Sequence, residues 1–297
     1  MSGNTPVRVG LAGAGPWAEH VHAPLLAAGP ETELVGVWSR TPERAAALAA
    51  RHRVPVFESY DALLAAADAV SLAVVPAAQP DLAVEAAEEG KALLLEKPLA
   101  LDVAGAQRIA DAVARNGVGS LMLLTYRFAD VVRDFLRDAA AGEWHGARAC
   151  FISGAFLGGA FAGGWRGDLG AVQDIGPHIL DLVEAALGPV TSVRAHGDPA
   201  SWVGASLTHA SGACSDVTMS CSSAIEPSRT EVELYGRTAS LMVDARAGAR
   251  AESFARVREE FAAVARSGAP HPCDAARGLE LAHLVARVEA ALGSPAA

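Results

Sequence analysis

The residues at positions 173–181 read Gln-Asp-Ile-Gly-Pro-His-Ile-Leu-Asp and combine a histidine with two carboxylates at helical spacing. In a helix, Asp174, His178 and Asp181 lie on one face. A carboxylate one turn from an imidazole orients its tautomer and stabilises its cation, which suits a proton-transferring histidine. Because proline is tolerated in a first helical turn, Pro177 predicts that Asp174 lies at or just before the helix start. Taken alone, however, the stretch is better explained as a capped helix with a structural histidine.

A glycine-rich turn follows the first apolar run, residues 7–12. In its Gly-x-Gly-x-x-Ala pattern, Gly13 permits the tight turn, Gly15 lets a pyrophosphate approach the backbone, and Ala18 allows close helix–strand packing. The helix that begins at Pro16 offers its free N–H groups to phosphate. Since the pattern follows the first strand of a strand–helix–strand unit, it predicts a dinucleotide site rather than a plain turn.

The end of the second apolar run, residues 33–39, indicates which dinucleotide to expect. An NAD-preferring site usually places Asp or Glu there to bind the 2′-hydroxyl of the ribose. This chain instead has Ser39-Arg40-Thr41, with Arg44 close behind, and such a group can accept a 2′-phosphate. The sequence therefore favours NADP(H), with NAD(H) as the alternative if Arg40 is only a solvated loop residue.

A third motif, Glu96-Lys97-Pro98, follows the apolar run at residues 92–95. Open α/β sheets bind their ligands at the carboxyl ends of such strands. A lysine at that edge can polarise a substrate oxygen or donate a proton to it. The alternative is a solvent-facing lysine in an ordinary proline turn, and the motif alone favours that alternative.

Up to residue 125, short apolar runs alternate with helical patterns. This alternation is typical of a doubly wound parallel sheet with right-handed crossovers. We therefore predict a dinucleotide-binding α/β domain over residues 1–125. Six strands are expected, at residues 7–12, 33–39, 54–57, 69–75, 92–95 and 121–124.

After residue 125 the pattern changes to consecutive short strands with turn signals, framed by helices. Strands without intervening helices indicate a largely antiparallel sheet. We therefore predict an α+β domain over residues 126–297, with helices on one face of a large open sheet. Strands are expected around residues 147–156, 192–196, 202–209, 213–222, 230–235 and 240–243, and closing helices at 251–266 and 275–292.

The composition narrows the class of protein. A chain of 297 residues with 51% apolar residues can form two domains, and a net charge of −10 argues against nucleic acid as a partner. Four cysteines without a Cys-x-x-Cys pair indicate reduced thiols. With no visible signal peptide and no run of about 18 apolar residues, a soluble cytoplasmic protein without membrane contacts is expected.

Together these motifs resemble the glucose–fructose oxidoreductase / inositol dehydrogenase / MocA family of NAD(P)-dependent oxidoreductases, and the resemblance covers nearly the whole chain. It implies a Rossmann domain followed by an open sheet that often packs in homodimers or homotetramers, with a C-terminal helix that can pack back on the Rossmann domain. The chain departs from the family at Val75-Pro76 and Pro80, where Thr-Pro and a helix-opening His are common. The segments that carry the resemblance are residues 10–15, 22–25, 90–99, 126–128, 165–166, 174–181 and 234–241.

The resemblance also implies roles for individual residues. Lys97 matches the active-site lysine, His178 the usual acid/base and Asp174 the accompanying carboxylate. Substrate contacts are expected from Lys97, Tyr126, Asp174 and His178. Cofactor contacts are expected from Gly13, Gly15, Pro16, Trp17, Ser39, Arg40, Val75, Pro76, Glu96, Lys97, Arg127, Trp165 and Arg166.

The resulting hypothesis is reversible hydride transfer between NADP(H) and the CH–OH or C=O group of a sugar, polyol or related small molecule. No metal is expected, because Lys97 supplies the positive charge at the reacting oxygen. One alternative is an oxidoreductase of a non-sugar substrate, such as a dihydrodiol, a keto intermediate or an imine. Another is a non-catalytic NADP(H)-binding sensor, which would have no use for Lys97, Asp174 and His178 together.

Overall fold

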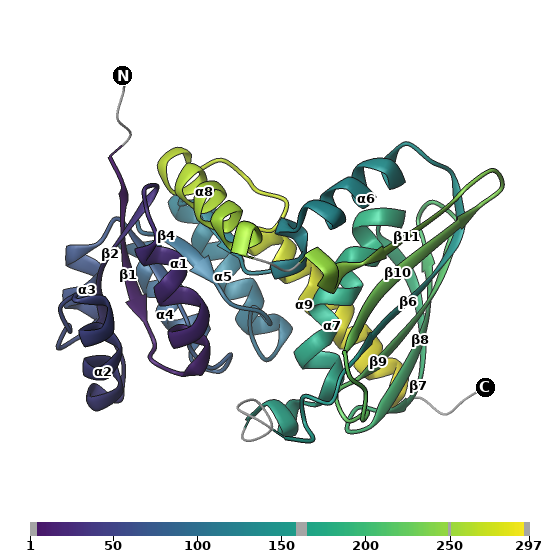
Figure 1. Cartoon of the computed structure of the whole chain (residues 1–297), viewed down its shortest axis with the longest axis horizontal. Helices are drawn as coiled ribbons and strands as arrows, with labels where there is room; N and C mark the ends of the chain where they lie inside the picture. Colours follow the sequence, from purple (N-terminus) through teal and green to yellow (C-terminus); the bar gives the residue numbers. More distant parts are fainter. Residues whose placement is uncertain (1–4, 159–164, 249–250, 294–297) are drawn as a thin grey trace. The chain divides into compact units, whose positions relative to one another are not determined.

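The computed structural model describes residues 5–158, 165–248 and 251–293, and the side chains of 165–168, 248 and 251 are not among the described parts. The chain divides into two compact units (Figure 1). One unit comprises Met1–Leu123 and Phe254–Leu279, and the other comprises Leu124–Ser253 and Glu280–Ala297.

The first unit contains a five-stranded parallel sheet in the order β2-β1-β3-β4-β5. Every residue of its short inner strands β3 and β4 is buried, as expected where helices cover a parallel sheet. The strands are β1 (Val7–Ala12), β2 (Thr32–Trp38), β3 (Ala69–Leu72), β4 (Ala92–Leu95) and β5 (Ser120–Met122). The connecting helices are α1 (Ala23–Ala27), α2 (Pro42–His52), α3 (Tyr60–Ala66), α4 (Gln79–Glu88) and α5 (Val103–Asn116).

The strand predicted at residues 54–57 is wrong. These residues make only an isolated parallel bridge, between Val56 and Val37. Val37 donates its N–H to the carbonyl of Pro55 and accepts the N–H of Phe57. Because Pro55 has no N–H of its own, the ladder cannot extend through it, and the sheet has five strands instead of six.

The helix after the glycine-rich turn begins at Pro16 and passes through a π-helix, η1 (Ala18–His22), before continuing as α1. The N–H of Ala23 donates to the carbonyl of Ala18, which is the longer spacing of a π-turn. Pro24 follows directly, and since it has no N–H it cannot close a regular helical bond to His20. The side chains of Trp17 and His22, on either side of this π-turn, both bind Glu96, the residue directly after β4.

Segments from the end of the chain complete the first unit. Helix α8 (Ala251–Ser267) reaches Glu31, whose carboxylate accepts a hydrogen bond from Arg258 Nε at 2.6 Å. Helix α9 (Ala275–Leu292) begins where the Ala275 N–H donates to Ser120 Oγ at 3.0 Å.

The second unit contains a six-stranded sheet in the order β11-β10-β6-β9-β8-β7, in which only the central β6–β9 pair is parallel. Buried and exposed residues alternate along β8 and β10. Figure 1 shows α6 and α7 along one side of this sheet. The strands are β6 (Trp144–Ile152), β7 (Val190–Asp198), β8 (Trp202–His209), β9 (Cys214–Ser220), β10 (Arg229–Gly236) and β11 (Ser240–Asp244), and the helices are η2 (Thr125–Phe128), α6 (Asp130–Ala140), α7 (Trp165–Leu187) and η3 (Ala245–Gly248).

Helix α7 corrects the predicted helix start near Asp174. The helix is broken at Gly170, whose φ of 77° and ψ of 175° are accessible essentially to glycine alone. Ala171 then starts the long part of the helix, with its N–H donated to the carbonyl of Pro199 at 2.9 Å. Asp174 therefore lies inside the helix, and Pro177 lies in its interior, at the loss of one helical hydrogen bond.

The predicted fold class is confirmed: a doubly wound parallel sheet in the first unit, and a mostly antiparallel sheet with helices in the second. Among the described residues, no helix is both long and apolar enough to pass through a membrane. The four cysteines, all within the described residues, form no disulfide bonds with one another.

Candidate active site

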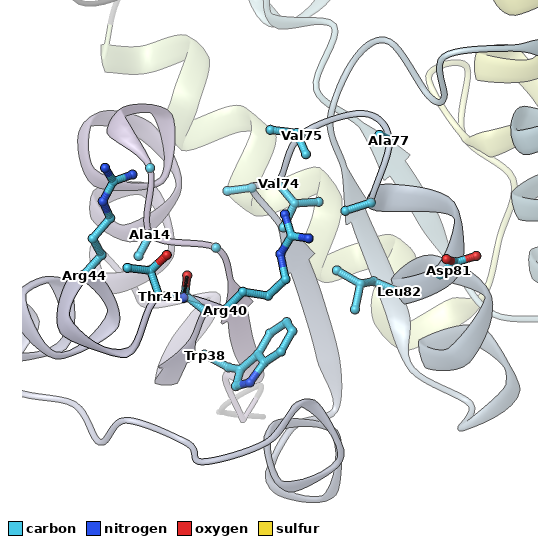
Figure 2. A pocket seen from close by; sticks show the side chains of 15 residues that line it. Ala14, Trp38, Arg40, Thr41, Arg44, Val74, Val75, Ala77, Asp81 and Leu82 are labelled. Atoms are coloured by element: carbon cyan, nitrogen blue, oxygen red, sulfur yellow. Dashed lines mark hydrogen bonds between the residues drawn. The ribbon is translucent and has the colours of Figure 1, made fainter. Parts of the chain in front are cut away.

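A cavity of about 510 Å³ opens at the carboxyl ends of β1, β2 and β3 in the first unit (Figure 2). Its size is typical of a small-molecule site. It is lined by the glycine-rich turn, the residues after β2 and the residues after β3, a combination that doubly wound sheets use for dinucleotides. The lining residues are Gly13, Ala14, Gly15, Trp38, Ser39, Arg40, Thr41, Arg44, Ala73, Val74, Val75, Ala77, Ala78, Asp81 and Leu82.

The two glycines of the turn have different surroundings. Gly13 has a φ of +116°, and a Cβ there would overlap the carbonyl group of Ala73. Gly15 has no heavy atom within 4 Å of where its Cβ would lie, yet it lines the cavity. Gly13 is therefore needed for its backbone conformation and for the close approach of Ala73. At Gly15 the space beside the backbone is open, so a ligand can approach it there.

The charge of the cavity favours an anionic ligand. Arg40 and Arg44 contribute two guanidinium groups to the lining. The one acidic lining residue, Asp81, accepts a hydrogen bond from Arg108 at 2.8 Å. In the view of Figure 2 Arg40 extends from the end of β2 towards Val74. Asp81 lies beyond Leu82, on the side away from Arg44. The lining thus fits a phosphate-bearing dinucleotide cofactor.

Lys97 follows β4, and its backbone is held by the side chain of Gln79, the first residue of α4. The Gln79 amide donates to the carbonyls of Glu96 at 2.8 Å and Leu99 at 2.9 Å. Its oxygen accepts the N–H of Glu96 at 2.8 Å. Gln79 is fully buried, and this clamp on both sides of Lys97 fixes the loop that carries the lysine.

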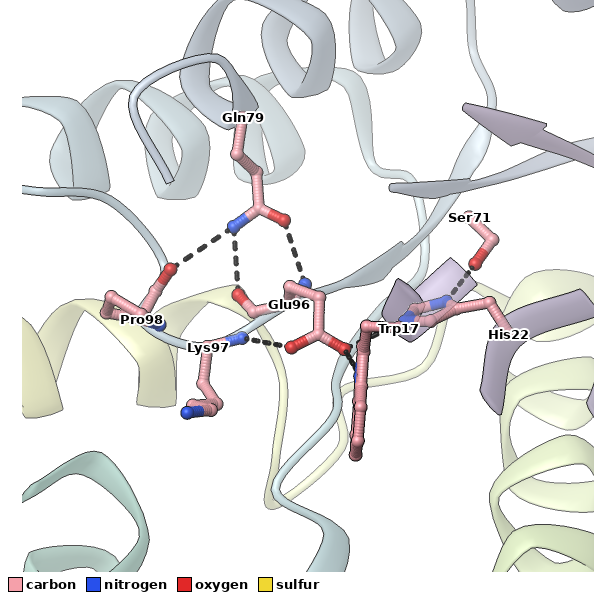
Figure 3. A network of polar contacts seen from close by, with 7 residues as sticks. All are labelled: Trp17, His22, Ser71, Gln79, Glu96, Lys97 and Pro98. Carbon is pink, nitrogen blue, oxygen red and sulfur yellow. Dashed lines mark hydrogen bonds and ion pairs between the residues drawn. The ribbon is translucent and has the colours of Figure 1, made fainter. Parts of the chain in front are cut away.

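The Glu96 carboxylate is held in a buried network (Figure 3). Its Oε1 accepts the indole N–H of Trp17 and lies next to His22 Nε2, both at 2.7 Å. Its Oε2 accepts the N–H of Lys97 at 3.2 Å. Because a carboxylate only accepts, Nε2 of His22 carries the proton, and the Nδ1 of a neutral ring then accepts the Ser71 hydroxyl at 2.7 Å.

In the second unit His178 and Asp174 lie one turn apart on α7, and both are buried. The His178 ring meets Tyr126 edge-on, with ring centroids 5.3 Å apart, and Phe151 lies 6.3 Å away. Burial raises the pKa of the Tyr126 hydroxyl, so this phenol stays protonated at neutral pH. The result is a buried imidazole between aromatic rings, with a carboxylate on the same helical face.

Arg127 and Asp181 form an ion pair within the second unit. Arg127 Nη1 lies 3.0 Å from both carboxylate oxygens of Asp181, which is almost fully buried. Asp181, the third polar residue of the helical face predicted from the sequence, therefore binds Arg127.

The structure distributes the predicted site residues between the two units. Gly13, Gly15, Ser39, Arg40 and Val75 line the cavity, and Trp17, Glu96 and Lys97 share the buried network. Pro16 and Pro76 do not line this cavity. Tyr126, Arg127, Asp174 and His178 belong to the second unit, and the side chains of Trp165 and Arg166 lie outside the described residues.

Sequence reasoning missed three fully buried residues of the network at Glu96, namely Gln79, His22 and Ser71. The available signals were a serine inside the apolar strand at residue 71 and a glutamine directly before Pro80. In the described parts of the chain, no three His, Cys, Asp or Glu side chains are grouped so as to hold a metal ion.

Comparison with known families accounts for both units. A model described as "Oxidoreductase family, NAD-binding Rossmann fold" matches residues 7–123. A model of the GFO/IDH/MocA C-terminal domain matches residues 108–242. The chain belongs to the GFO/IDH/MocA family of oxidoreductases. The family resemblance read from the sequence is thereby confirmed.

Curated relatives of this GFO/IDH/MocA protein include a reductase and a dehydrogenase that are named for sugar substrates. It is 31% identical over 195 residues to a dTDP-3,4-didehydro-2,6-dideoxy-alpha-D-glucose 3-reductase of Streptomyces violaceoruber, covering 63% of this chain and 56% of the relative. It is 29% identical over 208 residues to the D-glucoside 3-dehydrogenase of Escherichia coli K12, covering 65% and 58%. The matches thus span a little over half the length of these relatives.

Among solved structures, the UDP-N-acetylglucosamine 3-dehydrogenase of Acidithiobacillus ferrooxidans superposes with a TM-score of 0.85. The two chains are 24% identical, over 96% of this chain and 97% of the other. At that identity the likeness concerns the fold.

Proposed function

We propose that the protein transfers a hydride between NADP(H) and a CH–OH or C=O carbon of a sugar, polyol or related small molecule. The observation that carries the proposal is the cavity at the glycine-rich turn, with Arg40 and Arg44 in its lining and no carboxylate at the end of β2. The absence of that carboxylate supports NADP(H) over NAD(H), because a 2′-phosphate would meet basic and hydroxyl groups there.

The residues predicted to be catalytic each supply a distinct function in this proposal. Lys97 holds the substrate oxygen, and its ammonium favours the negative charge that develops there. A ring nitrogen of His178 takes up the hydroxyl proton during oxidation and returns it during reduction. Asp174, one turn before His178, orients the imidazole or binds a second hydroxyl. When bound, the nicotinamide supplies the hydride acceptor or donor.

Support for a sugar comes from the relatives. Both curated enzymes compared above are named for a reaction at position 3 of a hexose. We therefore propose a hexose derivative with a hydroxyl or keto group at that position as the first substrate class to screen. Dihydrodiols, keto intermediates and imines complete the screen.

The cofactor part of the proposal is tested by titrating the full chain with NADPH and with NADH, following nicotinamide fluorescence. We expect tighter binding of NADPH in the wild type. Arg40→Ala should weaken NADPH binding about tenfold or more, the loss of one charge-assisted contact, and should leave NADH binding nearly unchanged. Equal weakening of both cofactors would refute the 2′-phosphate assignment, and failure to bind either would refute the oxidoreductase proposal.

The catalytic part is tested by comparing turnover in Lys97→Met and His178→Asn with matched controls. Lys91, the other lysine of the chain, bonds to the carbonyl of Ala67, and His283 is exposed. We expect Lys91→Met and His283→Asn to retain turnover, and the two site variants to lose at least about 100-fold. Retained turnover in both site variants would refute their roles, whereas tight NADPH binding without any turnover would favour a sensor.

We further propose that copies of the chain associate through the face of the second sheet opposite α7. Trp202, Tyr235 and Met242 expose 46%, 43% and 68% of their surface, and their strand positions place them on that face. Light scattering after size exclusion should give a dimer or tetramer that Met242→Glu with Trp202→Glu dissociates. A wild-type monomer would refute this proposal.

We also propose a cytoplasmic location, which fits cysteines that form no disulfide bonds and is testable by cell fractionation.

A further inference from the structure

Trp17 connects two features that the proposed function uses separately, the nucleotide-binding turn and the substrate-binding lysine. It follows Gly15-Pro16 directly in the chain. Its indole N–H donates to Glu96 Oε1 at 2.7 Å, and the other oxygen of that carboxylate accepts the N–H of Lys97 at 3.2 Å. Two hydrogen bonds through a single buried carboxylate therefore join the turn to the backbone of Lys97 (Figure 3).

The direction of the Glu96 carboxylate depends on its donors. Trp17 and His22 both bind Oε1, and this leaves Oε2 facing the N–H of Lys97. A buried carboxylate that loses a donor is destabilised unless it turns to find another. Loss of the Trp17 bond is thus expected to alter the contact between Glu96 and Lys97, and not only the contact at Trp17.

The fold of the loop does not depend on Trp17. Gln79 binds backbone groups on both sides of Lys97, and none of these bonds involves the glycine-rich turn. Trp17 itself is only half-buried. Removing its indole N–H should therefore change the setting of Lys97 without unfolding the segment that carries it.

We propose that Trp17 is a positioning residue, which through Glu96 couples the nucleotide-binding turn to Lys97. In Figure 3 the Lys97 ammonium points away from the network, so Trp17 acts on the lysine through its backbone. The inference extends the proposed function by assigning Trp17 and Glu96 to the alignment of Lys97, where the sequence had predicted cofactor contacts.

The amino-acid composition makes a direct test feasible. The chain has two lysines, Lys91 and Lys97, among its 24 basic residues. Reductive methylation of the full chain with ¹³C-formaldehyde labels these two side chains and the amino terminus. In a ¹H–¹³C spectrum Lys97 then reports its own environment, and Lys91, bonded to Ala67, is an internal reference. Lys97→Arg and Lys91→Arg assign the signals.

Trp17→Phe removes the donor and keeps an aromatic ring. Trp144→Phe is the matched control, because Trp144 also donates its indole N–H, to the carbonyl of Ala139 at 2.8 Å, in the other unit. In Trp17→Phe we expect the Lys97 signal to shift or broaden, with Lys91 unchanged. NADPH should move the Lys97 signal less than in the wild type. Trp144→Phe should leave the Lys97 signal in place.

The proposal is overturned if Lys97 has the same signal in Trp17→Phe and the wild type, or if Trp144→Phe changes it equally. Should Trp17→Phe not fold, Glu96→Gln probes the same link, because its amide nitrogen cannot accept from Lys97 as the lost oxygen did. An unchanged Lys97 signal in that variant overturns the proposal too. If wild-type protein binds no NADPH, the proposed function fails, and the nucleotide-free spectra still decide the role of Trp17.

Discussion

Replacing Gly15 by alanine separates the two reasons for a glycine in the nucleotide-binding turn. A Cβ at Gly15 meets no protein atom within 4 Å, and its φ is not in the region that L-residues avoid. A Cβ at Gly13 would lie 2.7 Å from the carbonyl carbon of Ala73, and its φ is +116°. Gly15→Ala thus adds a methyl group to the cavity alone, and Gly13→Ala adds one to the packed backbone.

The expected magnitudes differ accordingly. Gly15→Ala should leave the free energy of unfolding unchanged or raise it by about 0.4–1 kcal/mol, because alanine restricts the unfolded chain. If a pyrophosphate approaches Gly15, the methyl group displaces it and costs one charge-assisted hydrogen bond, about 1.5–3 kcal/mol, or about 10- to 100-fold in the NADPH dissociation constant. Gly13→Ala should cost about 2–6 kcal/mol of stability, from backbone strain plus steric overlap.

Urea unfolding and NADPH titration of the same preparations measure both quantities. Gly293→Ala, at the end of α9, is a matched control whose Cβ makes only ordinary contact, 3.7 Å from the Ala290 carbonyl. It should leave NADPH binding unchanged and should change the free energy of unfolding no more than Gly15→Ala does. If Gly15→Ala bound NADPH like the wild type, the pyrophosphate would not approach this turn. If it were as unstable as Gly13→Ala, the steric reasoning would be wrong.

Three further predictions concern charged side chains that form hydrogen bonds. Arg127→Met should lower the free energy of unfolding by about 3 kcal/mol, because the buried Asp181 carboxylate loses the guanidinium that it binds. A loss of NADPH affinity with unchanged urea unfolding would instead indicate that Arg127 binds the cofactor. The hydrogen bond from Arg258 holds the pKa of Glu31 below its usual 4.5, so the pair stabilises the fold above that pH and the stabilisation is lost as the pH falls through the lower value. Because solvent screens this partly exposed pair, Glu31→Gln should cost at most about 1 kcal/mol at pH 7 and progressively less in urea titrations below pH 4.5. A pH-independent deficit would contradict this. Burial raises the pKa of Glu289 despite its hydrogen bonds from Gln173, so ionisation of this carboxyl destabilises the fold as the pH rises. Glu289→Gln should therefore be more stable than the wild type at pH 7 and equally stable below pH 4.5. Lower stability of the variant at pH 7 would refute this reasoning.

The sequence predicts well where local pattern and burial agree. The strands at residues 7–12 and 92–95 coincide with β1 and β4, because both are short apolar runs bounded by turn residues. The same holds for the residues that line the cavity, since Gly13, Gly15, Ser39 and Arg40 lie at strand ends that the topology brings together.

Prediction fails where a distant segment decides the local structure. The long part of α7 starts where Gly170 packs against Pro199 and Ala171 donates its N–H to the Pro199 carbonyl. No local sequence pattern indicates this distant contact, so Pro177 is wrongly predicted to lie in the first turn. Residues 54–57 have strand-like composition, but Pro55 confines their pairing to the single bridge with Val37. The network at Glu96 joins residues separated by up to 79 positions in the chain, which is beyond any periodicity argument.

The π-turn explains how Trp17 and His22 reach the same oxygen. In a regular α-helix, residues five positions apart point about 140° away from each other. A π-turn brings residue i+5 nearly over residue i, and the bond from Ala23 to Ala18 shows that spacing here. Both side chains therefore face Glu96 Oε1. Pro24 is the feature of the sequence that removes the competing α-helical bond, so the proline after His22 helps to aim two donors at the carboxylate beside Lys97.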